Sequence, residues 1–402
     1  MDIMLKYKMV ILKSFFIALL FSSSIYFEYF NIGNIFINSI TGLVSIYFLL
    51  TMSKKELFFI GFFIGLLWFW WIGYSFIYYD LIYLIPIILI FIGIIYGLLF
   101  YLSAIYPHII YRTFAIFSLS FIHPFGFNWF KPEVIFINSF FGIEKLDFLI
   151  IITTLALFIY YKRVYILTLL LFAISYTQTI IELPNIKIYQ PQYNISQETK
   201  WLKSYRDVLI EENLNNIDYA IKNDFELVIL PETIFPLPLN KNIPLINILK
   251  NKSKKTTIIT GALEFENNQY FNTTYMFKNG NMKIARKVVL VPFGESIPLP
   301  KILRDLINAY FYNGARDYSV ALEPTTFNIN GINFRNAICY EATTDKIFNK
   351  LDTSFIIATS NNAWFTPSIE PTLQNLLLKY YAKKYNVIIY HSSNSSKNKI
   401  IQ

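Results

Sequence analysis

The first 180 residues of the chain are almost continuously apolar, and charged and amide residues become frequent only after them. A helix needs about 20 apolar residues to cross a bilayer. Seven stretches approach or meet that length: 10–27, 35–52, 57–79, 82–105, 109–127, 147–161 and 163–180. The pattern therefore predicts a transmembrane helical bundle of about seven spans over residues 1–180.

Positive charges fall on alternate connections between these stretches. These positive residues are Lys6, Lys8, Lys13, Lys54, Lys55, Arg112, Lys162 and Arg163. By the positive-inside rule the N-terminus is cytoplasmic, and seven crossings place residues 181–402 on the other side of the membrane. The net charge of +9 is scattered without a long basic run, so it indicates contact with membrane lipid and gives no support to nucleic-acid binding.

The second part of the chain reads as one α/β domain over residues 181–402. Helical segments at 199–223 and 371–384 lie among short apolar runs, which predicts a layered sandwich with helices outside the sheets. The expected strands are 186–190, 226–230, 256–261, 270–277, 287–291, 334–339, 354–359 and 387–390.

Cys339 is the only cysteine in 402 residues. A lone cysteine forms no intramolecular disulfide and is too few for a zinc or iron–sulfur site. Two interpretations remain, an inert buried side chain and a nucleophile. A nucleophile needs partners, and two stand where a predicted strand meets a loop: Glu232 in "LVILPETIF" and Lys287 in "ARKVVLVPFGESIPL".

These three groups would make a coherent site. A free thiol has a pKa near ~8.5, and its thiolate form is the nucleophile. Glu232 could take the thiol proton as general base, and Lys287 could stabilise the oxyanion of a tetrahedral intermediate. Such chemistry requires neither a metal nor a cofactor. Taken singly, Glu232 is equally consistent with a helix cap or a surface ion pair, and Lys287 with a solvated strand lysine.

The order of these segments resembles the carbon–nitrogen hydrolase (nitrilase) superfamily. "PET", "VPFGE" and "CYE" carry Glu232, Glu295 and Cys339, and Lys287 precedes Glu295 by eight residues. "LVPFGE", "SNNAWF" and "FGFNW" resemble, more closely, the apolipoprotein N-acyltransferase family. This resemblance implies a transmembrane bundle joined to a nitrilase-like α-β-β-α sandwich. It also implies a bacterial inner membrane protein whose catalytic domain is periplasmic.

The resemblance also implies roles for individual residues. Cys339 would be the nucleophile, Glu232 the general base and Lys287 the oxyanion residue, with Glu295 supporting the lysine. Residues that match the family around the site or in its pocket and loops are Tyr340, Glu341, Trp201, Asn272, Trp364 and Phe365. For the aromatic members of this set, packing in the core is the alternative.

The implied reaction is ping-pong transfer of an acyl chain. Cys339 would take it from a membrane phospholipid as a thioester, and the α-amine of a diacylglyceryl-modified apolipoprotein would then accept it. Two apolar segments, 234–239 and 297–312, would face lipid, and the second is expected to form an interfacial helix. Asn362 and Thr366 depart from the family's acidic residue and glycine. No strand or eighth span is expected after "VIIYHSSNSSKN", so the domain would be shortened at its C-terminal end.

Two other functions remain open from the residues alone. The first is a membrane-anchored amidase or nitrilase, which would use water as the acyl acceptor. The second is a non-enzymatic transporter or membrane scaffold with a hydrolase-like outer domain, although the spans contain few charged residues.

Overall fold

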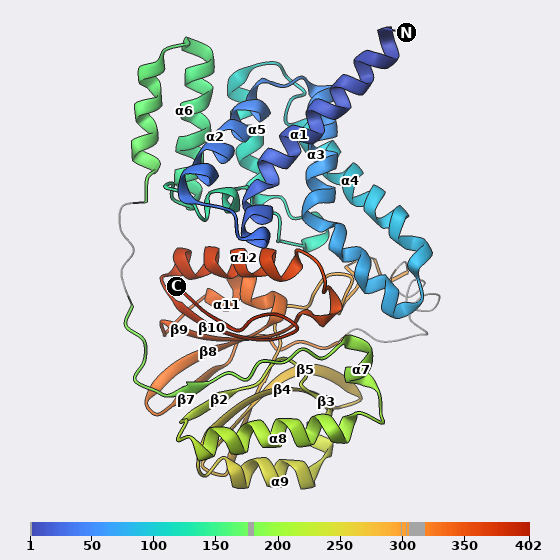
Figure 1. Ribbon diagram of the computed structural model, residues 1–402, viewed down its shortest axis with the longest axis vertical. Helices are drawn as coiled ribbons and strands as arrows, with labels where there is room; N and C mark the ends of the chain where they lie inside the picture. Colours follow the sequence, from blue (N-terminus) through green and yellow to red (C-terminus); the bar gives the residue numbers. More distant parts are fainter. Residues whose placement is uncertain (1, 176–180, 299, 303, 305–317) are drawn as a thin grey trace. The chain divides into compact units, whose positions relative to one another are not determined.

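A computed structural model describes residues 2–175, 181–298, 300–302, 304 and 318–402 (Figure 1). The chain forms two compact units. The first contains Met1–Gln178 and Pro367–Tyr380, and the second contains Thr179–Thr366 and Tyr381–Gln402. Helix α12 (Glu370–Tyr385) therefore begins in the first unit and ends in the second.

The first unit is helical, and each of the seven predicted stretches contains a helix. The helices are α1 (Asp2–Phe30), α2 (Ile35–Thr51), α3 (Lys54–Phe69), η1 (Trp70–Tyr79), η2 (Ile82–Leu84), α4 (Ile85–Leu102), α5 (Ile109–Ser118), α6 (Lys145–Tyr161) and η6 (Val164–Ala173), where η marks a 3₁₀ helix. Within the described part of the chain, three segments are long and apolar enough to cross a membrane: Leu5–Phe30, Lys54–Tyr79 and Ile82–Leu102. The α2 and η6 helices are apolar but shorter, so the number of crossings stays a prediction.

Close packing of α3 against α4 organises this unit. A Cβ atom at Gly61 of α3 would lie 2.5 Å from the carbonyl oxygen of Tyr96, so only glycine allows this approach. Aromatic rings fill the space beside the crossing. The Phe130 ring lies 4.9 Å from that of Tyr96 and 5.2 Å from that of Trp68. Dense aromatic packing therefore holds the α3–α4 pair together with the segment that follows α5.

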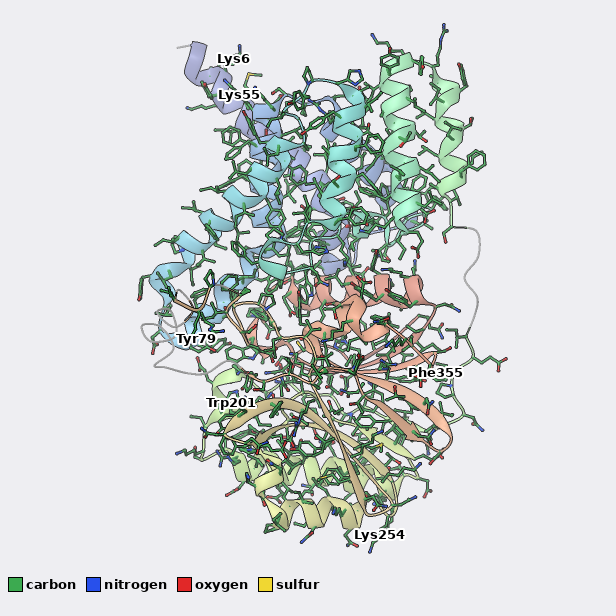
Figure 2. All side chains as sticks on the ribbon, turned by 180° about the vertical axis from the view of Figure 1, so that it is seen from behind. Lys6, Lys55, Tyr79, Trp201, Lys254 and Phe355 are labelled. Carbon is green, nitrogen blue, oxygen red and sulfur yellow. The ribbon has the colours of Figure 1, made fainter. Side chains whose placement is uncertain are left out.

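Several cationic residues lie at one end of the helical unit. Lys13 of α1 pairs with Glu56 in the first turn of α3 at 2.8 Å. Arg112 donates hydrogen bonds to the carbonyls of Leu50 and Met52 at the end of α2, at 2.7 and 2.8 Å. Figure 2 places Lys6 and Lys55 at this same end and Tyr79 at the other. The charges that alternate along the sequence therefore gather in space.

The second unit contains two mixed sheets. The first has the order β1-β2-β4-β5-β6, with β3 paired to β4, and the second has the order β11-β10-β9-β8-β7. The strands are β1 (Ile188–Tyr189), β2 (Leu227–Ile229), β3 (Phe235–Pro238), β4 (Thr257–Glu266), β5 (Gln269–Lys278), β6 (Asn281–Arg286), β7 (Thr326–Ile329), β8 (Ile332–Ile338), β9 (Phe355–Asn361), β10 (Ile388–Asn394) and β11 (Lys399–Ile401).

Helices cover the outer faces of both sheets. Helices α8 (Arg206–Lys222) and α9 (Ile243–Lys252) lie on the first sheet (Figure 1). Outside the second sheet, Phe348 of α11 (Asp345–Phe348) stacks on Tyr381 and Tyr385 in the last turn of α12. The predicted α-β-β-α sandwich is confirmed.

One hydrophobic core lies between the two sheets. Leu227, Ile229 and Ile259 of the first sheet pack in the same cluster as Phe334 and Ile357 of the second. The central strands pair in parallel, β2 with β4 and β9 with both β8 and β10. Because such strands are buried on both faces, their sequences are continuous apolar runs, which is why they could be recognised.

Several local predictions are wrong. Residues 287–291 form no strand, because the side chain of Glu341 binds the backbone N–H groups of Val288 and Val289. Segment 234–239 does not face lipid, because β3 pairs with β4 and its apolar side chains are buried. Strand β11 follows β10 and pairs with it antiparallel, although no further strand was expected. Most of segment 297–312 lies outside the described residues.

Candidate active site

Glu232 lies in a tight turn between β2 and β3. The turn is possible because Thr233 adopts a left-handed backbone conformation with φ of 46°. It packs closely on β4, where the N–H of Gly261 donates to the carbonyl of Pro231 at 3.2 Å. A Cβ atom at Gly261 would lie 2.3 Å from the backbone nitrogen of Thr233 and 2.6 Å from the Cα of Glu232. Gly261 therefore sets the position of the Glu232 backbone.

A Gly261→Ala substitution should displace this turn. The added methyl group meets only backbone atoms, which cannot rotate away, so we expect a loss of about 1–3 kcal/mol in the free energy of unfolding and a clear fall in activity. Thermal unfolding in detergent and an acyl-transfer assay measure the two effects. The matched control is Gly331→Asn, because nothing lies within 4 Å of that Cβ position and asparagine tolerates its φ of 84°. Equal effects in the two variants would contradict the close-approach role.

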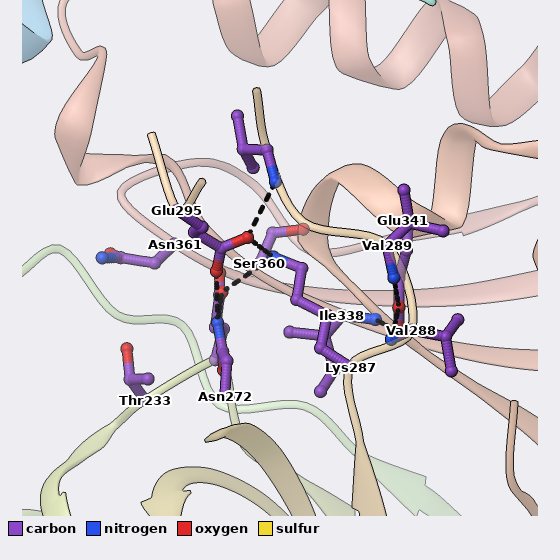
Figure 3. Close-up of polar contacts among 12 residues, drawn as sticks. Thr233, Asn272, Lys287, Val288, Val289, Glu295, Ile338, Glu341, Ser360 and Asn361 are labelled. Carbon is purple, nitrogen blue, oxygen red and sulfur yellow. Dashed lines mark hydrogen bonds and ion pairs between the residues drawn. The ribbon is translucent and has the colours of Figure 1, made fainter. Parts of the chain in front are cut away.

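Lys287 is the first residue after β6, and its side chain is fully buried at 0% exposure. Its Nζ lies 2.7 Å from Oε2 of Glu295 (Figure 3). The same atom lies 3.8 Å from Oε1 of Glu232. Burial by itself would lower the pKa of Lys287, but the two carboxylates outweigh it and raise that pKa above its ordinary value. Lys287 is therefore a permanent ammonium group between two acids.

Asn272 of β5 joins the two acids. Its Nδ2 donates to Oε1 of Glu232 at 2.7 Å and to Oε1 of Glu295 at 2.9 Å. The Glu295 carboxylate also accepts from the backbone N–H of Val291 at 3.0 Å, so it is held on three sides (Figure 3). Asn272, Glu232, Glu295 and Lys287 thus form one network.

Cys339 follows β8 directly and begins a short 3₁₀ helix, η8 (Cys339–Thr343). Its φ of 54° lies in the left-handed region, which is costly for a residue with a side chain and recurs at functional turns. The thiol is half-buried. A thiolate charge at Cys339 favours the protonated forms of two buried lysines, Lys287 and Lys200, and so raises the pKa of each. Cys339 therefore interacts electrostatically with both lysines.

Glu341 connects the cysteine turn to the lysine segment. Its Oε1 accepts from the N–H of Ile338 at 2.8 Å, and its Oε2 accepts from Val288 and Val289 at 2.6 and 3.1 Å (Figure 3). Burial raises the pKa of Glu341 to about 7, although the Lys287 charge and the three N–H donors act in the opposite direction. This side chain therefore fixes the neighbours of Cys339 and Lys287 relative to each other.

A Glu341→Ala variant should be strongly destabilised. Three backbone N–H groups lose their acceptor, and each unpaired buried donor costs about 1–3 kcal/mol. We expect a loss of at least about 3 kcal/mol, which is roughly 6–12 °C in melting temperature for a domain of this size. Glu323→Ala, at an exposed position, serves as control and should stay within about 0.5 kcal/mol. Similar melting temperatures for the two variants would refute this role of Glu341.

The remaining predicted residues are less central. Tyr340 is buried beside the cysteine. Trp201 is 40% exposed, so the alternative interpretation, that this ring packs in the core, is wrong (Figure 2). Trp364, the last residue of η9 (Asn362–Trp364), and Phe365, which follows it, are half-buried. Lys200, in contrast, is fully buried next to Glu232, and sequence reasoning missed it because nothing local distinguishes it from a solvated helix lysine.

The arrangement suits acyl transfer through a thiol. It combines a carboxylate that can move a proton, an ammonium group that can stabilise an oxyanion, and a sulfur nucleophile at a strained turn. Across the described ranges, no group of three or more His, Cys, Asp and Glu side chains could hold a metal ion.

Two family descriptions match the chain. "Apolipoprotein N-acyltransferase integral membrane domain" matches residues 8–178, and "Carbon-nitrogen hydrolase" matches residues 188–387. An apolipoprotein N-acyltransferase of Wolinella succinogenes is 41% identical over 96% of this chain and 94% of its own length. One of Campylobacter jejuni is 42% identical over 97% of this chain and 89% of its own. A carbon–nitrogen hydrolase structure from Helicobacter pylori covers 52% of this chain and 72% of its own at 13% identity, with a TM-score of 0.37.

The two matches account for both units, and the relatives cover nearly the whole chain. The helical part is thus an integral membrane domain, and a purely non-enzymatic role is excluded. The chain belongs to the apolipoprotein N-acyltransferase family and is a membrane-bound acyltransferase of lipoprotein N-acylation.

Proposed function

We propose that this enzyme takes an acyl chain from a membrane phospholipid and transfers it to the α-amine of an N-terminal S-diacylglyceryl-cysteine through a thioester on Cys339. The observation that carries this proposal is the network of Lys287, Glu232 and Glu295, in which the buried lysine interacts electrostatically with the only cysteine of the chain. The apolipoprotein N-acyltransferases that the chain resembles support the identity of the acceptor.

In the first half-reaction Glu232 acts as the general base. Asn272 holds Oε1 of Glu232, whereas Oε2 accepts no hydrogen bond from the residues that the structure describes. This oxygen is therefore suited to take the thiol proton. The thiolate attacks the ester carbonyl of the phospholipid, and the oxyanion of the tetrahedral intermediate forms beside the Lys287 ammonium. The C–O bond then breaks, and Glu232 returns the proton to the departing lysophospholipid oxygen.

In the second half-reaction the Cys339 sulfur is the leaving group, and the apolipoprotein amine is the nucleophile. The free amine of the apolipoprotein attacks the thioester carbonyl, and Glu232 accepts a proton from that amine. The C–S bond breaks as the amide forms, and the thiol recovers its proton. Glu295 takes no part in proton transfer, because it is engaged by Lys287, Asn272 and the N–H of Val291. It keeps the ammonium in place throughout the cycle.

We place the catalytic domain in the periplasm and the N-terminus in the cytoplasm of a bacterial inner membrane. The gathering of Lys13, Arg112 and Lys55 at one end of the helical unit supports this orientation. Seven crossings would then deliver residues 181–402 to the side where lipid-anchored substrates reside. Reporter fusions that are active only in the cytoplasm or only in the periplasm, placed after residue 30 and residue 181, test this topology.

The reaction itself is tested with phospholipid labelled in its acyl chain. The purified enzyme is incubated with this donor in mixed micelles, with and without a synthetic peptide that begins with diacylglyceryl-cysteine. We expect the label to move to the peptide amine only when the peptide is present. A matched peptide with an acetylated α-amine should remain unlabelled.

The remaining rival is a hydrolase that uses water as acceptor. It predicts release of labelled fatty acid at the same rate with either peptide and no labelled amide. That outcome would overturn the proposed acceptor and leave the acyl-enzyme chemistry intact. Absence of any acyl transfer from phospholipid would overturn the donor as well.

A further inference from the structure

A second buried lysine lies in the site, outside the predicted triad. Lys200 belongs to the short helix α7 (Gln197–Trp201) and is fully buried, whereas the next residue, Trp201, is exposed. The Nζ of Lys200 donates to the backbone carbonyl of Glu232 at 3.0 Å and to Oγ1 of Thr233 at 2.7 Å. Both acceptors belong to the strained turn that carries the general base.

Helix α7 is itself held firmly. Its first residue, Gln197, accepts from Nδ2 of Asn361 through Oε1 at 2.9 Å. Asn361 in turn accepts from Nδ2 of Asn394 at 2.8 Å, and Asn394 also donates to the carbonyl of Ile195 at 2.8 Å. These amides join the ends of β9 and β10 to α7. Lys200 is therefore presented to the turn from a fixed support.

Among the residues that the structure describes, two titratable groups act electrostatically on Lys200. They are the Glu232 carboxylate, from the turn after β2, and the Cys339 thiol, from the turn after β8. Burial lowers the pKa of Lys200 to about 7, although both of these groups favour its ammonium form. A neutral amine still has two N–H donors, so loss of the charge would leave both hydrogen bonds of Lys200 possible.

We propose that Lys200 is a positioning residue of the active site, which anchors the Glu232–Thr233 turn and, while it is protonated, adds a second positive charge that acts on the Cys339 thiol. Through this charge it favours the thiolate, and through the anchor it sets the direction of the Glu232 carboxylate. The inference rests on the proposed role of Cys339 as nucleophile. The two buried lysines then have different functions. Lys287 pairs with Glu295, whereas Lys200 binds the turn that carries Glu232.

The thiol itself provides the test. Because Cys339 is the only cysteine in the chain, the rate of alkylation by iodoacetamide reports on this thiolate alone and requires no substrate. Lys200→Met should move the pH profile of the alkylation rate to higher pH by about one unit, which is about tenfold slower alkylation at neutral pH. Lys203→Met, at an exposed position close by, should leave the profile unchanged.

A second variant covers the case in which Lys200→Met does not fold. Thr233→Val keeps the shape of the side chain and the Lys200 charge but removes one acceptor, so the charge is less well placed. We expect a smaller upward displacement of the profile, about threefold in rate at neutral pH. Both variants should also lower kcat for acyl transfer more than they raise KM.

A merely structural lysine would give a different result. Lys200→Met would then lower the melting temperature while the midpoint of the alkylation profile stayed at its original pH, and this would overturn the proposal. If Lys200→Met cannot be folded, an unchanged profile in Thr233→Val overturns it. Failure of acyl transfer from phospholipid, with the expected alkylation profiles, would instead refute the proposed reaction and leave the role of Lys200 standing.

Discussion

Replacement of Cys339 by alanine is expected to abolish acyl transfer, with a rate at least about 10⁴-fold lower than that of the unsubstituted enzyme. No other sulfur nucleophile is present in the chain. Because the side chain is only half-buried and small, the substitution should change the melting temperature little. After incubation with labelled phospholipid, mass spectrometry should find an acyl thioester on the peptide that contains residue 339, and only in the unsubstituted enzyme.

Cys339→Ser supplies the matched control. It keeps a nucleophilic atom at the strained turn but replaces the thiol by a much less acidic hydroxyl, so any acyl-enzyme should be an ester that forms very slowly. Transfer by Cys339→Ala at a rate close to that of the original enzyme would show that the acyl chain passes directly from donor to acceptor. The ping-pong mechanism would then be wrong.

The second large effect is expected for Lys287→Met. Removal of one oxyanion-stabilising group costs about 10²–10³ in kcat. The same change leaves the carboxylates of Glu232 and Glu295 close together, without the cation that lies 3.8 and 2.7 Å from them. An uncompensated buried charge costs about 3–5 kcal/mol. Lys287→Met should therefore lose both activity and stability, measured by initial rates and by thermal unfolding.

Lys283→Met separates this effect from a general loss of positive charge. Lys283 lies on β6, four residues before Lys287, but is exposed. Its replacement should change the free energy of unfolding by less than about 1 kcal/mol and leave kcat unaltered. The assignment of Lys287 fails if its variant keeps a normal kcat, or if the two lysine variants behave alike.

The strands that could be predicted from sequence are those buried on both faces. Their apolar runs, such as the one before Glu232, are typical of strands buried on both faces. The predictions for β3 and for residues 287–291 failed for two different reasons. An apolar run next to proline can be a buried edge strand, and a β-branched run can be drawn out of a sheet when a distant carboxylate binds its N–H groups.

The residues of the candidate site also fall into those that the sequence could predict and those that it could not. Glu232, Lys287 and Cys339 could be selected because each is an unusual residue at the end of a strand-like run. Lys200 and Gly261 could not, since their importance arises entirely from contact with the Glu232 turn. No property of the segments that contain these two residues reveals which turn lies against them.

The sequence by itself determined a membrane-embedded helical part, a sandwich domain and its candidate reactive groups. These depend on the length of apolar runs and on residue type, which are local properties. Only the tertiary structure decided how the groups are held, because the bonds that hold them connect distant segments. Glu341 reaches Val288 across 53 residues and Lys200 reaches Glu232 across 32, and each pair meets only when the sheets and α7 have come together.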